Sequence, residues 1–462
     1  MLLIIVLYFL AIISIGIWSR KKAGSREGFF VAHRKGTTPL ITGSLLATII
    51  GGSATVGLAG LGFSQGLTGA WWLLVGAIGL LILGFLLAKK IRALALYTLP
   101  ELVESQYDHR VGLAASILIV IAWVGVVSGQ IVAAGKVLSV LGFGSPLFWM
   151  STFTMVFVAY AILGGQYSII HTDVIQAVLL LVGLSAVVAI IFPLVGGLGG
   201  LKASLPPDYF SFPVSTKFDW KALLSFLILV GATYVVGPDM YTRLFCSKGE
   251  KTAQKSTFIT AFLISVFAFV IALIGMAARV LYPDIPAEQA FPQIVMGTLP
   301  PALKGIVLAA LVAALMSSAD TCLLSQSVIL TEDVFGRFRP IDERKTLLLT
   351  RLSIIMLGLV ALGLAITSKG VISSLLFAYT IFTCGLVVPV IAGFYREKLK
   401  VTAEGALAAL VGGGLLGVLG KIPDLGFPLK EDLGLVGFAV SAILLFGVSF
   451  VTRRQGQRKS VL

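Results

Sequence analysis

Thirteen apolar runs of about 20 residues constrain this chain more than any other feature, because a helix of that length spans a bilayer. Of the 462 residues, 58% are hydrophobic and only 12% are charged, with a mean hydropathy of +1.02. A soluble domain cannot bury so much apolar surface. We therefore predict an all-α polytopic membrane protein with about 13 transmembrane helices, over residues 1–18, 38–62, 69–88, 113–141, 146–163, 168–195, 222–242, 256–281, 303–331, 346–367, 371–395, 402–420 and 433–452.

The basic residues are divided unevenly between the two sets of connecting loops. With an outside N-terminus, the loops expected in the cytoplasm hold 25 Lys and Arg residues and the opposite loops hold 8. This asymmetry predicts an outside N-terminus and a cytoplasmic C-terminus in the cell membrane. Topology thus explains the net charge of +14, and we expect a lipid bilayer, not nucleic acid, as partner. The expected cytoplasmic segments are 20–37, 89–112, 164–167, 243–255, 332–345, 396–400 and 453–462.

Two of the runs contain helix-breaking residues. The run 38–62 contains Gly51 and Gly52, and the run 222–242 contains Gly237 and Pro238. Close helix packing is the better explanation for glycines alone, but a proline interrupts a helix. The two runs lie five spans apart, so they cross the membrane in opposite directions, and paired broken helices in inverted repeats indicate a transporter's central site.

The short loops leave no room for a separate soluble domain. We therefore expect residues 1–462 to form a single membrane transport domain. Within it, the segment 1–37 holds the first helix and a basic loop, the repeats are 38–195 and 222–395, and 402–462 holds the C-terminal helices and a basic tail.

A ladder of polar residues follows one face of the run 303–331. At 100° per residue, the sequence "AALMSSADTCLLSQSV" places together Ala314, Ser317, Ser318, Thr321 and Ser325, with Asp320 on the flank. Serines that bond to their own helix would explain this face as tight packing. A buried aspartate needs water, a partner or an ion, and Asp173 in "GGQYSIIHTDVIQ" is a second such carboxylate. Hydroxyl, carboxylate and carbonyl oxygens are hard ligands that suit Na⁺.

Four segments resemble the sodium:solute symporter family, whose members include proline, pantothenate, choline and sugar symporters. They are "GGQYSIIHTDVIQ", "AALMSSADTCLLSQSVILTEDVF", "GPDMYTRLFCSKGE" and "YTLPELVE", and with the glycine-rich run 38–62 the resemblance covers residues 1 to about 452. It implies a LeuT-type fold with a 5+5 inverted repeat and sodium-driven symport of a small organic solute by alternating access.

The resemblance also implies where ions bind. A shared sodium site would use the carbonyls of Ala47, Ile50 and Ala314 with the hydroxyls of Ser317 and Ser318. The residues implied for an ion pathway or a further ion site are Asp173, Asp320 and Thr321. Na⁺ is the expected coupling ion, and we expect no organic cofactor.

The solute pocket is expected near mid-membrane, between the runs 38–62, 113–141, 222–242 and 371–395. Its candidate residues are Ser53, Thr55, Gln130, Thr233, Tyr234, Tyr379 and Thr383. For the primary amide of Gln130, a bond between helices and a contact with solute are equally good explanations. The solute class stays open among amino acids such as proline, monocarboxylates or pantothenate, choline-like compounds and sugars.

Other functions fit the sequence less well. A membrane enzyme needs a nucleophile–base or metal constellation, whereas His33 and His109 lie in loops and His171 stands alone beside Asp173. A channel usually repeats a filter element, and none is evident, so we expect neither an enzyme nor a channel. A proton-coupled symporter of the same fold, with Asp173 or Asp320 as the relay, is the alternative. We expect a monomer to be sufficient for transport.

Overall fold

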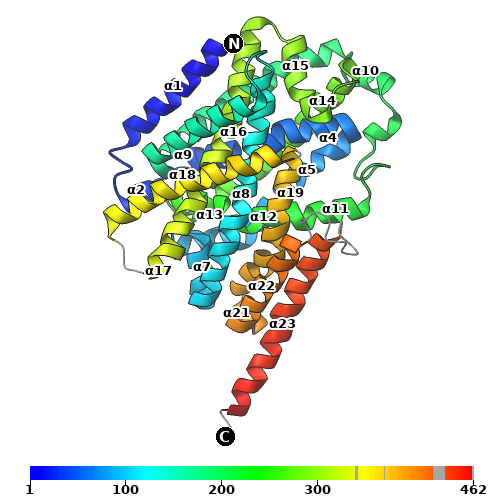
Figure 1. The fold of residues 1–462 in the computed structure, drawn as a ribbon. Helices are drawn as coiled ribbons and strands as arrows, with labels where there is room; N and C mark the ends of the chain where they lie inside the picture. Colours follow the sequence, from blue (N-terminus) through cyan, green and yellow to red (C-terminus); the bar gives the residue numbers. More distant parts are fainter. Residues whose placement is uncertain (339–341, 369, 420–431, 460–462) are drawn as a thin grey trace.

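The computed structural model describes residues 1–338, 342–368, 370–419 and 432–459. These residues form helices and no strand beyond two isolated bridges. The helices stack around α16, and α23 extends away from the others toward the C-terminus (Figure 1). Part of the loop 332–345, residue 420 of the run 402–420, and the loop that follows that run lie outside the described residues.

The first half of the chain forms α1 to α10. The bounds of these helices and of the intervening 3₁₀ or π segments are α1 (Leu2–Ser19), α2 (Arg26–Val31), η1 (Ala32–Arg34), α3 (Thr38–Ile49), η2 (Ser53–Gly57), α4 (Leu58–Gln65), η3 (Gly66–Ala70), α5 (Trp71–Ile82), η4 (Leu83–Leu87), α6 (Ala88–Leu94), α7 (Leu99–Gln106), α8 (His109–Ser139), α9 (Pro146–Leu194) and α10 (Gly197–Ser204).

The second half continues in the same way. Its elements are η5 (Pro207–Phe210), α11 (Trp220–Phe226), η6 (Leu227–Gly231), α12 (Ala232–Val236), α13 (Pro238–Cys246), α14 (Glu250–Leu281), η7 (Ala287–Gln289), α15 (Ala290–Thr298), α16 (Pro301–Ile329), η8 (Leu330–Phe335), α17 (Gly336–Phe338), α18 (Glu343–Thr367), α19 (Val371–Phe382), η9 (Thr383–Val387), α20 (Val388–Gly393), α21 (Arg396–Leu399), α22 (Ala403–Leu419) and α23 (Leu433–Lys459).

All thirteen apolar runs fall on these helices. By length and composition, ten helical stretches of the described chain are long and apolar enough to cross a membrane, and two shorter apolar helices, α3 and α22, accompany them. One stretch, α9, has 49 residues, far more than a single crossing needs, and it kinks at Gly165, where φ is 50°. The all-α membrane architecture is confirmed, while thirteen as the number of crossings stays a prediction.

Both broken helices are confirmed. In the run 38–62, α3 ends at Ile49, and Ile50 has the non-helical backbone angles φ −86° and ψ 58°. Helical structure then resumes and continues into η2. In the run 222–242, the helix breaks at Gly237, whose backbone is extended at φ −61° and ψ 134°, and α13 starts at Pro238. A proline pushes the residue before it toward extended backbone and cannot donate to the preceding turn, which accounts for this second break.

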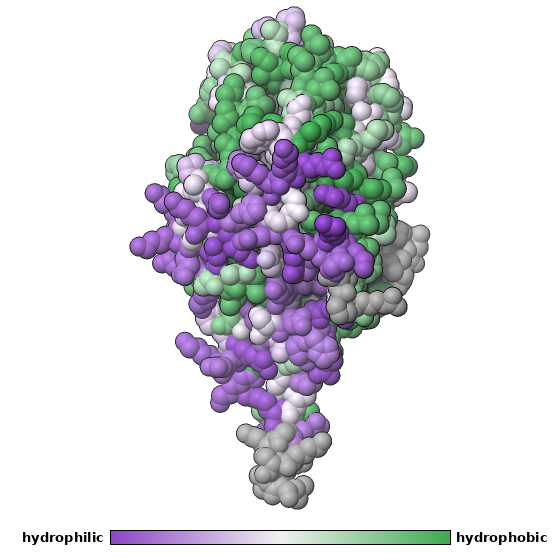
Figure 2. Space-filling model, turned by 90° about the vertical axis from the view of Figure 1, so that its left-hand side faces the viewer, coloured by the Kyte–Doolittle hydropathy of each residue, from purple (hydrophilic) through white to green (hydrophobic). Residues whose placement is uncertain are grey.

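Six of the expected cytoplasmic segments meet on one face of the molecule. Hydrogen bonds or ion pairs join them through Lys22–Tyr167, Arg34–Ala95, Arg92–Ser247, Arg26–Glu332, Arg337–Glu104 and Arg396–Gln106. Figure 2, viewed from the side where α2 and α17 lie in Figure 1, shows hydrophilic residues gathered over this face and hydrophobic residues above it. The loops expected on the opposite side are also joined, as in Lys217–Ser64 and Lys221–Asp432.

The most enclosed helix is α16, which carries the polar ladder. In the apolar stretch Pro301–Phe338, 94% of the most apolar window is buried, against 28% to 72% in the other candidate spans. It packs on α8, α9, α3 and α18. The polar ladder therefore faces protein and not lipid, so its oxygens are positioned to act inside the bundle.

Candidate functional site

The helix break that follows α3 and the serines of α16 together form a cluster of oxygen atoms, which we call the oxygen cradle. The Ser317 hydroxyl donates to the Ala47 carbonyl at 2.8 Å and to the Ala314 carbonyl at 2.9 Å. The Ser318 hydroxyl donates to the Thr48 carbonyl at 2.6 Å and lies 3.3 Å from the Ala314 carbonyl. Five oxygens from α3 and α16 thus converge.

The Gln130 side chain of α8 helps to hold this break open. Its Oε1 accepts the N–H of Gly52 at 2.7 Å. In a continuous helix that N–H would donate to the carbonyl four residues earlier, which is Thr48. Because Gln130 takes the donor, the Thr48 carbonyl is left to Ser318. A Cβ at Gly51 would collide with the Ser318 hydroxyl, so this close approach of α16 requires glycine.

This geometry agrees with four of the five residues of the expected sodium site. Ala47, Ala314, Ser317 and Ser318 come together, whereas Ile50 stands in the break itself and accepts no hydrogen bond from either serine among the described residues. The Ile50 carbonyl as a sodium ligand stays a prediction. Thr48, whose carbonyl accepts from Ser318, is a further candidate that the sequence did not indicate, because the sequence does not show where the helical bonds stop.

The ion-pathway candidates lie together beside the cradle, around an arginine that the sequence did not single out. Arg243 and Asp173 are both fully buried and form an ion pair at 2.9 Å. Arg243 also donates to the hydroxyls of Ser44, Thr48 and Thr321. Ser44 in turn donates to Asp173.

The burial of Arg243 changes the count of basic residues in the cytoplasmic loops. Its place in the segment 243–255 counted it among the cytoplasmic cations, but it points into the bundle from the short helix α13 and is 0% exposed. Its position one turn after a proline break was the available signal, because a break allows a helix end to stand inside the membrane.

Asp320 is the remaining member of this cluster. It is fully buried, its Oδ1 lies 3.4 Å from the Thr321 hydroxyl, and its Oδ2 has no hydrogen-bond partner among the described protein atoms. No group of three or more His, Cys, Asp and Glu side chains in the described chain is arranged to hold a metal ion. The available ligands near α16 are instead neutral oxygens and separate carboxylates, a set that suits an alkali cation.

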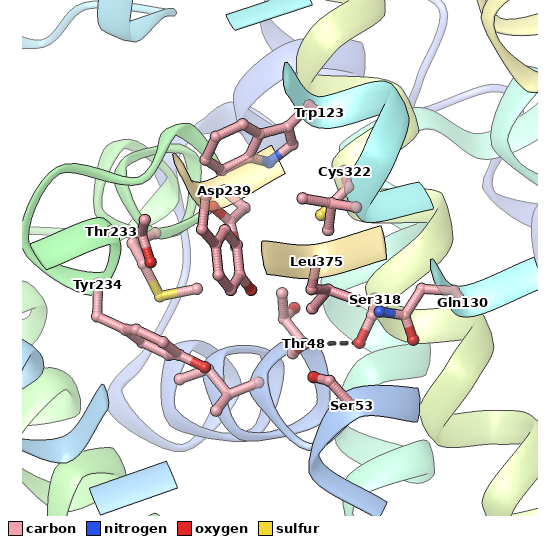
Figure 3. Close-up of a pocket in the computed structure, with 14 residues that line it drawn as sticks. Thr48, Ser53, Trp123, Gln130, Thr233, Tyr234, Asp239, Ser318, Cys322 and Leu375 are labelled. Atoms are coloured by element: carbon pink, nitrogen blue, oxygen red, sulfur yellow. Dashed lines mark hydrogen bonds between the residues drawn. The ribbon is translucent and has the colours of Figure 1, made fainter. Parts of the chain in front are cut away.

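A small cavity adjoins the cradle (Figure 3). It is bounded by the broken helices, α8, α16 and α19, and Ser318 and Thr48 belong to both the cavity wall and the cradle. Its lining consists of Thr48, Ile49, Ser53, Trp123, Val126, Gln130, Thr233, Tyr234, Asp239, Met240, Ser318, Cys322, Leu375 and Tyr379.

Five of the seven expected pocket residues line this cavity: Ser53, Gln130, Thr233, Tyr234 and Tyr379. The other two do not. Thr55 donates to the Gly51 carbonyl of its own helix, and Thr383 donates to the Leu229 carbonyl of η6. Both hydroxyls are used in packing because they face a neighbouring turn and not the cavity. Asp239 and Met240, which directly follow the proline break, also line the cavity but were not predicted from the sequence.

The combination of paired broken helices, an oxygen cradle at one break and a cavity beside it defines a secondary transporter of the LeuT type. Solved structures support this fold. The chain aligns with a Na⁺-coupled sialic acid symporter at a TM-score of 0.81 and 17% identity, covering 97% of this chain and 96% of that one. It aligns with MhsT, solved in complex with L-phenylalanine, at a TM-score of 0.52 and 18% identity, covering 89% and 97%.

The sequence comparisons give the family. The model of the Sodium:solute symporter family matches residues 29–413, and this chain belongs to that family. Among similar proteins, sodium/glucose cotransporter 2 of Rattus norvegicus is 26% identical over 92% of this chain and 72% of its own length. Sodium/myo-inositol cotransporter 2 of Mus musculus is 25% identical over 91% of this chain and 70% of its own length.

Proposed function

We propose that this protein is a sodium-coupled secondary active symporter that imports a small organic solute across the cell membrane by alternating access. One observation carries the proposal: Ser318 and Thr48 line the cavity and also form part of the oxygen cradle. Ion and solute would therefore stabilise the same arrangement of α3, η2 and α16. By linkage, each then raises the affinity of the other by an equal factor.

Of the fourteen residues that line the cavity, the five expected from the sequence, namely Ser53, Gln130, Thr233, Tyr234 and Tyr379, are proposed to contact the solute. Na⁺ would be held by Ser317, Ser318 and the carbonyls of Ala47, Thr48 and Ala314. Asp173, Asp320 and Thr321 would line the route of the ion beyond the cradle. A monomer contains all of these groups.

The proton-coupled alternative has less support. Asp173, one of the two relays considered, is held by Arg243 and Ser44. The family and the curated relatives are named for sodium. The chemistry of the cradle, which offers neutral hydroxyl and carbonyl oxygens, also favours a metal cation over a proton.

Uptake into vesicles that contain the purified protein tests the proposal. A panel of radiolabelled amino acids, monocarboxylates, ammonium compounds and sugars is offered with an inward sodium gradient, an inward proton gradient or neither. We expect accumulation of one solute class with the sodium gradient alone. Equal accumulation with the proton gradient, or uptake that ignores both gradients, would contradict sodium coupling.

A further inference from the structure

We propose that the solute is a small organic cation, an ammonium compound, bound between the carboxylate of Asp239 and the aromatic rings of the cavity. This inference rests on the proposed symport function and names the class of solute for the same cavity. It is carried by three features: the charge of the lining residues, the charge balance of the bundle interior, and the rings around the cavity.

Asp239 is the one ionisable carboxylate among the fourteen lining residues, and no Lys, Arg or His lines the cavity. It is only partly buried, whereas Asp173 and Asp320 are fully buried. Among the described residues, no cationic side chain forms an ion pair with it. Arg243, one helical turn later, is instead paired with Asp173. A carboxylate that faces a cavity without a cation is suited to receive one from the ligand.

The charge balance of the interior points the same way. Four charged side chains lie close to the cradle and the cavity: Arg243, Asp173, Asp239 and Asp320. Arg243 balances Asp173, so among the described residues Asp239 and Asp320 are left without a cationic side chain. Bound Na⁺ or a proton would neutralise the fully buried Asp320, and a cationic solute would neutralise Asp239. An anionic solute would instead add a negative charge beside Asp239, in a region where unpaired charge is costly.

The rest of the cavity wall suits an alkylated ammonium group. Figure 3 shows the rings of Trp123 and Tyr234 bordering the same space as Asp239. Tyr379 and Met240 also line the cavity. Aromatic faces attract ammonium groups through the ring quadrupole, and a thioether offers a polarisable apolar contact. An ammonium compound in the cavity would thus contact one carboxylate and several aromatic rings.

A sugar or an anion would fit this wall less well. A sugar requires many unpaired donors and acceptors, but three of the lining polar groups are already bonded inside the protein. Ser318 donates to Thr48, Thr233 donates to Val230, and the Gln130 oxygen accepts from Gly52. The start of α13 would otherwise favour an anion, but Asp239 itself lies in the first turn of α13 and already places a negative charge there.

Ligand-induced thermal stabilisation of the purified full-length protein tests the inference, with radioactive sodium binding measured in parallel. The probes are tetramethylammonium, butylammonium and choline, and dimethylbutanol serves as the uncharged analogue of choline. Glucose, myo-inositol and acetate represent neutral and anionic solutes. In saturating sodium we expect an ammonium probe to bind about tenfold or more tightly than its uncharged analogue. Asp239→Asn should remove that preference, and Asp239→Glu should keep it.

The two levels of the proposal fail differently. If the wild-type protein binds no sodium, the symport function itself is wrong. If it binds sodium but is stabilised by none of the ammonium probes, or by glucose, myo-inositol or acetate instead, only the cationic solute class is overturned. Equal binding of choline and dimethylbutanol to the wild-type protein would overturn it as well, whether or not Asp239→Asn folds.

Discussion

Arg243 is the residue whose burial makes the strongest demand on its surroundings. A guanidinium in the interior of a membrane bundle needs both an opposite charge and hydrogen-bond acceptors. Asp173 supplies the charge, and Ser44, Thr48 and Thr321 supply acceptors. Because Thr48 also belongs to the cavity wall, Arg243 connects the ion pair to the place where solute is proposed to bind.

We therefore predict that Arg243→Gln and Asp173→Asn each lower the free energy of unfolding by about 3–5 kcal/mol, since each leaves a buried charge unpaired. The double variant should lose less than the sum of the two, because it removes both charges. Thermal unfolding of the purified variants measures this. Additive losses would show that the two side chains act independently. Asp173→Asn should also slow transport or change the number of sodium ions carried per cycle.

At the scale of elements, the break after α3 depends on one side chain from another helix. We predict that Gln130→Met lowers the free energy of unfolding by about 1–3 kcal/mol, because the Gly52 N–H loses its partner. Sodium affinity should fall with it, since the Thr48 carbonyl is no longer kept for Ser318. Thermal unfolding and sodium titration check both effects.

Ser128 provides the matched control for this prediction. It lies two residues away on α8, is fully buried, and its hydroxyl has no hydrogen-bond partner among the described residues. Ser128→Ala should therefore leave both stability and sodium affinity near the wild-type values. A Gln130→Met variant that behaves like Ser128→Ala would mean that the break is held by packing alone.

The breaks and the helices could be predicted from sequence because their causes are local. Apolar length marks a span, and Pro238 with Gly237 marks a break within a few residues. The hydrogen-bond partners across the bundle could not be predicted from the sequence. Gln130 bonds to a residue 78 positions away and Arg243 to one 70 positions away. Such choices depend on how helices are arranged in space, which also explains why Thr48 and not Ile50 contacts Ser318.

At the scale of the whole molecule, the distribution of basic residues predicts the orientation. Cysteines introduced at Lys22 and Arg454 should react with a membrane-impermeant maleimide only after the cytoplasmic side is opened, whereas a cysteine at Lys217 should react in intact cells. All three positions are exposed, and the three native cysteines are buried, so background labelling should be low. Labelling of Lys22→Cys or Arg454→Cys in intact cells would reverse the orientation.

The central claim is that the serine cradle of α16 binds the coupling ion. The most direct measurement is binding of radioactive sodium to purified Ser317→Ala and Ser318→Ala, with Ser327→Ala as the control, because Ser327 bonds only within its own helix. We predict that each cradle variant binds sodium about tenfold more weakly, while the control binds normally and solute binding recovers at high sodium. Wild-type sodium affinity in both cradle variants would show that the ladder is helix packing and that the ion binds elsewhere.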